Sequence, residues 1–122
     1  VRKFINKHQR FAVSKLLKTN FGCVVDGRDI GSEVFKNAQL KLFINVKLKI
    51  RAKRRHKQLI EHGEKSIQSQ ILKDLKLRDI SDTTRKASPL IVPAGAVIID
   101  NSNSFESTKA QINQALIKLK QF

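Results

Sequence analysis

The apolar residues along the chain follow the periods that distinguish helices from short buried strands. Between residues 2 and 18 they recur every three or four positions, which predicts a helix with one apolar face. A similar spacing predicts a helix over 67–82, with Ser66 as its N-cap, and a last helix capped by residues 101–104. A strongly basic helix is expected over 47–62.

Three short runs are apolar almost without interruption, as buried strands are. They cover residues 23–26, 40–45 and 96–100 and are separated by the expected helices. Pro89 and Pro93 break the chain before the third run. This order predicts an α/β fold in which a parallel sheet is covered by helices on both faces. Cys23 lies in the first run, so we expect it to be a small buried side chain, and we expect His8 to be packed on its helix.

Each predicted strand ends in a polar residue: Asp26, Asn45 or Asp100. Ligands bind beyond the carboxyl ends of strands in open parallel sheets, so a site is expected at this edge. The first of the three ends leads directly into an arginine and a second aspartate.

The segment Asp-Gly-Arg-Asp, residues 26–29, combines a donor fork with carboxylate acceptors on a turn that glycine permits. Arg28 can hold a phosphate with two parallel hydrogen bonds, and Asp29 can accept a hydrogen bond from an amine or a hydroxyl. The alternative interpretation is an ordinary turn with a surface ion pair.

A second group of charges lies at the end of the expected helix 67–82. Arg78, Asp82 and Arg85 are spaced by four and three residues, so they share one side of a helix. They can bind a sugar hydroxyl and a negative charge together, or they can form a surface ladder of ion pairs that contributes little. Asp79 lies off this face and is expected to pair elsewhere or to cap the helix.

Charge is the strongest feature of the composition. The 122 residues contain 25 Lys and Arg against 10 Asp and Glu, a formal net charge of +15. This charge suits nucleic acid, a solvated lysine-rich surface, or arginines that face a small polyanion. Seven cations fall within residues 47–57, where no aromatic residue interleaves with them, which disfavours stacking on single-stranded bases.

Several classes of protein are disfavoured. No run approaches the roughly 18 apolar residues that span a bilayer, and no signal peptide is recognisable, so a cytoplasmic location is expected. A single cysteine excludes an internal disulfide and an ordinary zinc site. No GxxxxGK[ST] loop is present. The chain begins at Val1 and contains no methionine, so we expect a fragment or a processed product.

Taken together, the motifs and their order resemble bacterial cytidylate kinases over the whole chain, which corresponds to the later half of that family. GRDIG is followed at the family's distance by RD-x-x-D-x-x-R and a Pro-Leu pair. The matching blocks, in order, are VRKFINKHQRFA, VVDGRDIGSEVF, LKLFIN, IRAKRRHKQL, LKLRDISDTTRKASPL and AVIIDNS. The resemblance implies part of the parallel sheet of a P-loop nucleoside monophosphate kinase, flanked by helices.

The resemblance also implies an activity, the transfer of the terminal phosphoryl group of ATP to CMP or dCMP with Mg²⁺. Arg2 and Asp29 match residues that meet the cytosine base. Arg28 and Arg85 match arginines that hold the acceptor phosphate, and we expect them to be the catalytic residues. Arg78 and Asp82 match a pair that addresses the sugar and the neighbouring phosphate.

A basic segment of about residues 47–82 matches the lid of these kinases. Arg51, Arg54 and Arg55 belong to the part that folds over the ATP phosphates. The expected partners are therefore CMP or dCMP and ATP, with no membrane and no nucleic acid.

The glycine-rich phosphate loop of the family, which provides the magnesium ligand, has no counterpart in this sequence. The strand that leads into it lies between those matching 23–26 and 40–45, so its absence leaves a gap of about 9–10 Å in the sheet. We therefore predict that the isolated chain lacks kinase activity and is poorly stable unless the missing N-terminal half is supplied. The alternatives are a basic nucleic-acid-binding domain and a non-catalytic pseudoenzyme that retains the acceptor site.

Overall fold

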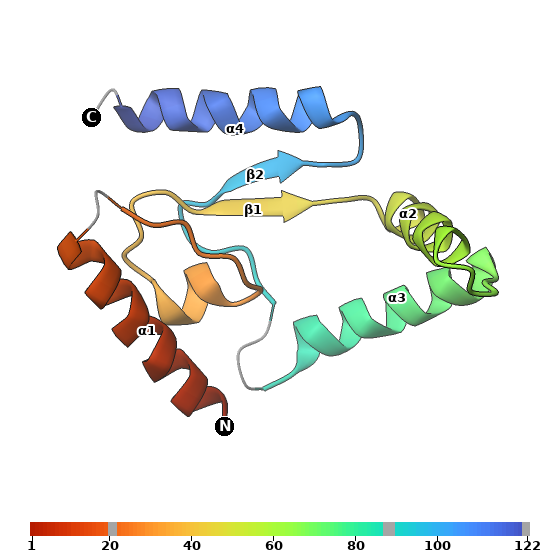
Figure 1. Ribbon diagram of the computed structural model, residues 1–122, viewed down its shortest axis with the longest axis horizontal. Coiled ribbons are helices and arrows are strands. Elements are labelled where there is room, and N and C mark those ends of the chain that lie inside the picture. The colour runs from red at the N-terminus through yellow and green to blue at the C-terminus, as the bar shows by residue number, and fades with distance from the viewer. Residues whose placement is uncertain (20–21, 87–89, 121–122) are drawn as a thin grey trace.

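A computed structural model describes residues 1–19, 22–86 and 90–120. Figure 1 shows the elements that these residues form, in chain order: α1 (Arg2–Thr19), the short π-helix η1 (Ile30–Val34), β1 (Leu42–Asn45), α2 (Leu48–Glu61), α3 (Gln68–Thr84), β2 (Val97–Asp100) and α4 (Phe105–Lys120).

The two strands form a parallel pair, so the coarse prediction of an α/β fold is confirmed. Leu42 lies opposite Val97, and the register continues to the ends of both strands. The Val97 N–H donates to the Lys41 carbonyl at 2.9 Å, and the Asn101 N–H donates to the Asn45 carbonyl at 2.8 Å. Alternate residues of a strand direct their backbone N–H and C=O groups to the same side. Phe43, like Lys41 and Asn45, therefore directs these groups to β2. Leu42 and Ile44 direct theirs to the opposite edge.

The outer edge of β2 is partly closed by a side chain of α4. The Gln111 Oε1 accepts from the Asp100 N–H at 2.9 Å, and the Gln111 Nε2 donates to the Asp100 carbonyl at 2.9 Å. The amide of Gln111 thus substitutes for one residue of a neighbouring strand. On the other edge of the sheet, the outward groups of Leu42 and Ile44 have no hydrogen bond to a described residue, so this edge of β1 is open.

The predicted strand at 23–26 is not present, and this prediction was wrong. The segment is extended but exchanges no ladder hydrogen bonds with another described strand, and Val24 is fully exposed. A strand is stable only when a neighbour satisfies its N–H and C=O groups, and the described chain offers none here. For the same reason Cys23 is exposed rather than buried. His8 is also exposed, since α1 contacts the rest of the molecule mainly through η1.

Packing is thin for a chain of this size. The buried apolar residues are Val34, Ala52, Ile99 and Ala115. The accessible surface is 9950 Å², whereas a compact monomer of 13.9 kDa exposes roughly 6,700 Å². Phe4 and Phe11 on α1 are 75% and 65% exposed. Much apolar surface therefore has no cover within the described part of the chain.

One helix packs on the sheet, and two others pack mainly on each other. α2 and α3 pack on each other as a hairpin that extends away from the sheet on the side opposite α1, and Ala52 is fully buried in that contact (Figure 1). α4 packs against β2 through Ala115 and covers Ile99. No described helix is long and apolar enough to cross a membrane.

The predicted helix ends are correct in one case and wrong in another. The Ser107 N–H donates to the Ser104 hydroxyl at 3.2 Å, so the expected cap of the last helix is confirmed. Ser66 is not the N-cap of α3; Ile67 has that position, and the Ser66 hydroxyl bonds to the ring of His56 instead. The expected break at Pro89 lies outside the described residues.

Candidate functional site

The Gly-Arg-Asp segment turns sharply before η1. A Cβ atom on Gly27 would lie 2.4 Å from Cγ1 of Ile30, so any other residue here would force the Ile30 side chain or the turn to shift. The glycine is therefore needed because Ile30 packs over its backbone. This close approach fixes the direction in which Arg28 and Asp29 leave the turn.

The π-helix η1 follows directly and was not predicted from the sequence. The Glu33 N–H donates to the Asp29 carbonyl at 2.9 Å, and the Phe35 N–H donates to the Ile30 carbonyl at 2.7 Å. The second bond spans five residues and widens the turn, a feature that occurs frequently at functional sites. Asp29 is the N-cap of η1, and Val34 at its other end is buried, so the segment is anchored in the core.

The structure brings together two motifs that lie 54 residues apart. Nη1 of Arg28 is 2.5 Å from one oxygen of Asp82, and Nη1 of Arg85 is 3.5 Å from the other oxygen. The Asp82 side chain is only 13% exposed. One carboxylate thus lies between two guanidiniums, which leaves a net positive cluster that suits a phosphate group.

A second ion pair lies beside this cluster. Nη1 of Arg2, in the first turn of α1, is 3.4 Å from Oδ2 of Asp29. Arg2 is about half exposed and Asp29 is mostly shielded. The pair presents donors and an acceptor next to the cluster of Arg28, Arg85 and Asp82.

Arg78 lies on α3 near these groups but forms no hydrogen bond with a described residue. The hydrogen bonds from Arg51 lower the pKa of the Asp79 carboxyl below its ordinary value, against a smaller effect of burial. The charges of Arg51, Arg28 and Arg78 add to this lowering. Arg78 therefore acts on Asp79 through its charge, while Asp82 is held by the two other arginines.

Arg51 is the most firmly held of the three expected lid arginines. It donates from Nη1 to Oδ1 of Asp79 at 2.8 Å, from Nη2 to Oδ2 at 2.5 Å, and from Nε to the Val46 carbonyl at 3.2 Å. The hydrogen bond to Asp79 also raises the pKa of Arg51. The prediction that Asp79 pairs off the Arg78–Asp82 face is confirmed. Arg51 ties α2 both to α3 and to the end of β1.

The two other arginines point in different directions. Nη2 of Arg54 donates to the Asn103 carbonyl in the β2–α4 loop at 3.3 Å. Nη1 of Arg55 donates to the side chain of Gln58 on the same helix at 3.0 Å. Both bonds are exposed, so both arginines can leave them at little cost.

The comparison with known families tests the resemblance that the sequence motifs indicated. The family model described as cytidylate kinase matches residues 1–121. The chain belongs to the cytidylate kinase family. This confirms the resemblance that the sequence motifs indicated.

Curated cytidylate kinases agree with this assignment. The enzyme of Rickettsia akari is 44% identical over 102 residues, which cover 84% of this chain and 45% of the relative. That of Rickettsia felis is 42% identical over the same length and coverage. That of Rickettsia bellii is 40% identical over 119 residues, 97% of this chain and 53% of the relative. The chain therefore spans about half the length of the curated relatives it matches.

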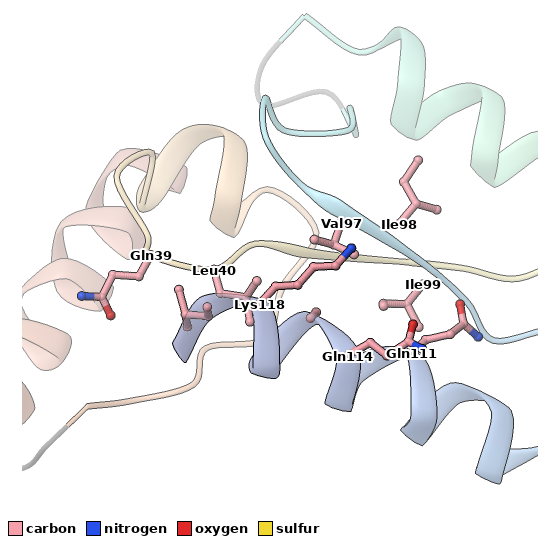
Figure 2. A pocket seen from close by; sticks show the side chains of 10 residues that line it. Gln39, Leu40, Val97, Ile98, Ile99, Gln111, Gln114 and Lys118 are labelled. Carbon is pink, nitrogen blue, oxygen red and sulfur yellow. The ribbon is translucent and has the colours of Figure 1, made fainter. Parts of the chain in front are cut away.

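A cavity of about 420 Å³ lies away from the arginine cluster, between α4 and the start of the strands (Figure 2). Its polar side chains are Gln39, Gln111, Gln114 and Lys118, and its floor is formed by apolar residues of β2. It contains no carboxylate and one cation. Its lining therefore differs from the arginine–aspartate cluster, which contains two carboxylates and three guanidiniums.

Magnesium requires several oxygen ligands in near-octahedral geometry. Within residues 1–19, 22–86 and 90–120, no three Asp, Glu, His or Cys side chains gather. Asp29 and Asp82, the carboxylates of the cluster, are both engaged by guanidiniums. The described residues thus do not form a magnesium site of their own.

Sequence reasoning missed two parts of the site. Arg10 of α1 donates to the backbone of η1, and the sequence contains no signal that separates Arg10 from the other basic residues of its helix. The partner of Asp79 was also not identified, because Arg51 lies 28 residues away on another helix. In both cases the tertiary arrangement selects the partner of a long, flexible cation.

Proposed function

We propose that the chain forms the acceptor site and the lid of a nucleoside monophosphate kinase, which transfers the γ-phosphoryl group of ATP to CMP or dCMP. The observation that carries this proposal is the convergence of Arg28 and Arg85 on Asp82 beside the Arg2–Asp29 pair. Membership of the cytidylate kinase family supports it. The proposed domain is the C-terminal portion of a P-loop kinase sheet, with a lid that includes α2 and α3.

Arg28 and Arg85 are proposed to bind the phosphate of CMP. The dianionic phosphate competes with Asp82 for both guanidiniums and offers the bidentate geometry that arginine prefers. Because the attacking oxygen already belongs to a phosphate, no general base is required. The two arginines act by positioning the acceptor and by offsetting the charge that its oxygens bring near the donor.

Arg2 and Asp29 are proposed to read the base. The Asp29 carboxylate accepts from the exocyclic amine of cytosine, and Arg2 donates to the ring oxygen or nitrogen. Uracil has a carbonyl where cytosine has the amine, so it would leave Asp29 facing an acceptor. This arrangement favours CMP over UMP.

Arg78 and Asp82 are proposed to meet the sugar. Asp82 accepts from a ribose or deoxyribose hydroxyl once phosphate has taken the guanidiniums, and Arg78 lies one turn away on α3 with its side chain exposed. Both residues come from the end of the helix that also supplies Arg85, so phosphate and sugar are held by one element.

The α2–α3 hairpin is proposed to close over ATP. Arg54 and Arg55 make only exposed hydrogen bonds and can turn toward a triphosphate, whereas Arg51 must first leave Asp79. ATP carries Mg²⁺ in this chemistry, and the ion neutralises phosphate charge. Its ligands are expected from the phosphates and from outside this chain.

The open edge of β1 is proposed to pair with a strand from the other half of the kinase, which also carries the phosphate loop. Leu42 and Ile44 direct unpaired N–H and C=O groups to this edge, and the chain exposes about half as much surface again as a compact protein of its mass. The isolated chain is therefore expected to lack kinase activity. The complete enzyme is proposed to act in the cytoplasm.

Calorimetric titration of the chain with CMP tests the acceptor site directly. Arg28→Gln and Asp29→Asn are each expected to weaken CMP binding by roughly tenfold or more, because each removes a charge-assisted hydrogen bond. Lys53→Gln, an exposed position on α2, is the matched control for the loss of one charge. CMP binding that is unaffected by the two site substitutions would refute the assignment.

The same samples separate the kinase from the nucleic-acid alternative. Binding of RNA or DNA that is strong, steeply dependent on salt and indifferent to CMP would favour a basic nucleic-acid-binding domain. CMP binding without phosphorylation, even after the other half of a cytidylate kinase is added, would favour a pseudoenzyme.

A further inference from the structure

Arg10 holds the far end of the π-helix that carries the acceptor residues. Its Nε donates to the Val34 carbonyl at 3.1 Å, and its Nη2 donates to the Glu33 carbonyl at 3.1 Å. The first of these bonds is partly buried, and Val34 itself is one of the few buried apolar residues. A single guanidinium thus clamps two successive carbonyls at the end of η1.

These carbonyls belong to the last turn of η1, where the helix has no further N–H groups to donate to its last carbonyls and where the backbone dipole is negative. A cation with two donors is a suitable partner for them. η1 comprises only five residues, so it has little internal hydrogen bonding to keep its shape. The Arg10 clamp supplies stability that so short a helix lacks.

The helix that carries Arg10, α1, also contacts the other end of η1. Arg2, in the first turn of α1, pairs with Asp29, the N-cap of η1. Arg2 and Arg10 are separated by eight residues, about 12 Å along the helix axis. α1 is therefore fixed to both ends of η1, and the relation between Arg2 and Asp29 depends on both attachments.

We propose that Arg10 is a positioning residue, which holds η1 against α1 so that Arg2 and Asp29 stay aligned on the base and Arg28 on the phosphate. This inference rests on the proposed acceptor site. Arg10 touches no proposed substrate atom and acts only through the backbone of Glu33 and Val34.

Amide hydrogen exchange followed by NMR tests the clamp without any ligand. In the chain with Arg10→Gln, we expect exchange at the Glu33 and Phe35 amides to become roughly tenfold faster, since both close η1. Lys7→Gln removes the same charge from an exposed position on α1 and is expected to leave both amides unchanged. Unchanged exchange in Arg10→Gln would overturn the proposal whatever the chain binds.

Nucleotide titrations test the functional part. Arg10→Gln is expected to weaken CMP binding by roughly tenfold and to reduce the preference for CMP over UMP, because Asp29 loses its alignment. Arg10→Lys keeps a cationic donor and is expected to retain part of the CMP affinity and part of the preference for CMP over UMP. A role limited to overall folding would lower the CMP and UMP affinities in the same proportion.

The outcomes separate this inference from the proposed function. If the parent chain and Arg10→Gln bind CMP equally while Arg28→Gln does not bind, the positioning role is wrong and the acceptor site stands. If the CMP-to-UMP ratio is the same in Arg10→Gln and the parent chain, the positioning role is also wrong. If the parent chain binds no CMP, the proposed function fails, and the exchange of the Phe35 amide still decides whether Arg10 holds η1.

Discussion

A pair of proline substitutions in β1 discriminates between the two edges of this strand. Phe43 faces β2, because Lys41 and Asn45 on either side of it accept hydrogen bonds from β2. Ile44 directs its N–H away from β2, to the open edge. Proline removes the N–H donor and is tolerated only where the donor has no partner. Phe43→Pro should therefore break the sheet, and Ile44→Pro should preserve it.

The expected difference follows from the hydrogen bonds. Phe43→Pro removes one ladder bond, about 1 kcal/mol, and leaves a β2 carbonyl without a partner, about 1–3 kcal/mol more. Ile44→Pro loses no ladder bond. Both variants also lose a partly exposed apolar side chain, about 1 kcal/mol of burial for Ile44, which is 48% exposed, and at least as much for Phe43. These losses largely cancel, so the two variants should differ by roughly 2 kcal/mol or more, which is at least about thirtyfold in local opening.

Hydrogen exchange at the Ile99 and Asn101 amides measures this difference, because both donate to β1. Phe43→Pro should abolish their protection, and Ile44→Pro should retain most of it. Equal loss in the two variants would refute the assignment of the edges.

The open edge is then tested with the other half of a cytidylate kinase, such as that of Rickettsia bellii, supplied as a second chain. We expect CMP phosphorylation in the mixture with the parent chain and with Ile44→Val, which keeps the N–H. Ile44→Pro should not support it, although its own sheet is intact. Phosphorylation with Ile44→Pro at the level of Ile44→Val would show that no strand pairs there.

Four further predictions follow from particular side chains. Asp79→Asn should weaken the α2–α3 contact by roughly 0.5–1 kcal/mol, since this ion pair is about one-third exposed. Arg51 lowers the pKa of Asp79, so the stabilisation should be fully present above the ordinary pKa of an aspartate and be lost as pH falls through the lowered pKa. Circular dichroism between pH 7 and pH 2 measures this as the difference in stability between the parent chain and Asp79→Asn. Ile99→Ala should cost about 2–5 kcal/mol in urea unfolding, as its side chain is 1% exposed. Gln111→Ala should expose the edge of β2 and speed exchange of the amide it holds by roughly tenfold. Cys23 should react completely with a thiol reagent without denaturant, and slow reaction would contradict its exposure.

The sequence was sufficient for features that depend on local pattern. The helices α1, α2 and α3 begin and end within two residues of their expected bounds, and α4 begins directly after its expected cap at 101–104. The parallel orientation of 40–45 and 96–100 was also predictable, since short apolar runs separated by helices favour a parallel sheet, whereas their direct pairing came from the structure.

The failure at 23–26 has a physical cause. The run has the composition of a buried strand, but burial and pairing come from other segments, and no described segment covers it. Composition reports the environment for which a segment is suited and not the one it has. The turn at η1 could not be predicted either, because a π-helix depends on the close contact between Gly27 and Ile30 and on the Arg10 clamp.

Asp82 has a further consequence for the proposed acceptor site. Two guanidiniums within reach of one carboxylate repel each other by about 1–3 kcal/mol at the effective dielectric of a protein surface. Asp82 offsets this repulsion and keeps Arg28 and Arg85 in place without ligand. A monovalent anion brings no more charge than the carboxylate that already holds both arginines, whereas a phosphate dianion brings more charge and more acceptors. Asp82 therefore both organises the arginines and sets the charge that a ligand must carry to displace it.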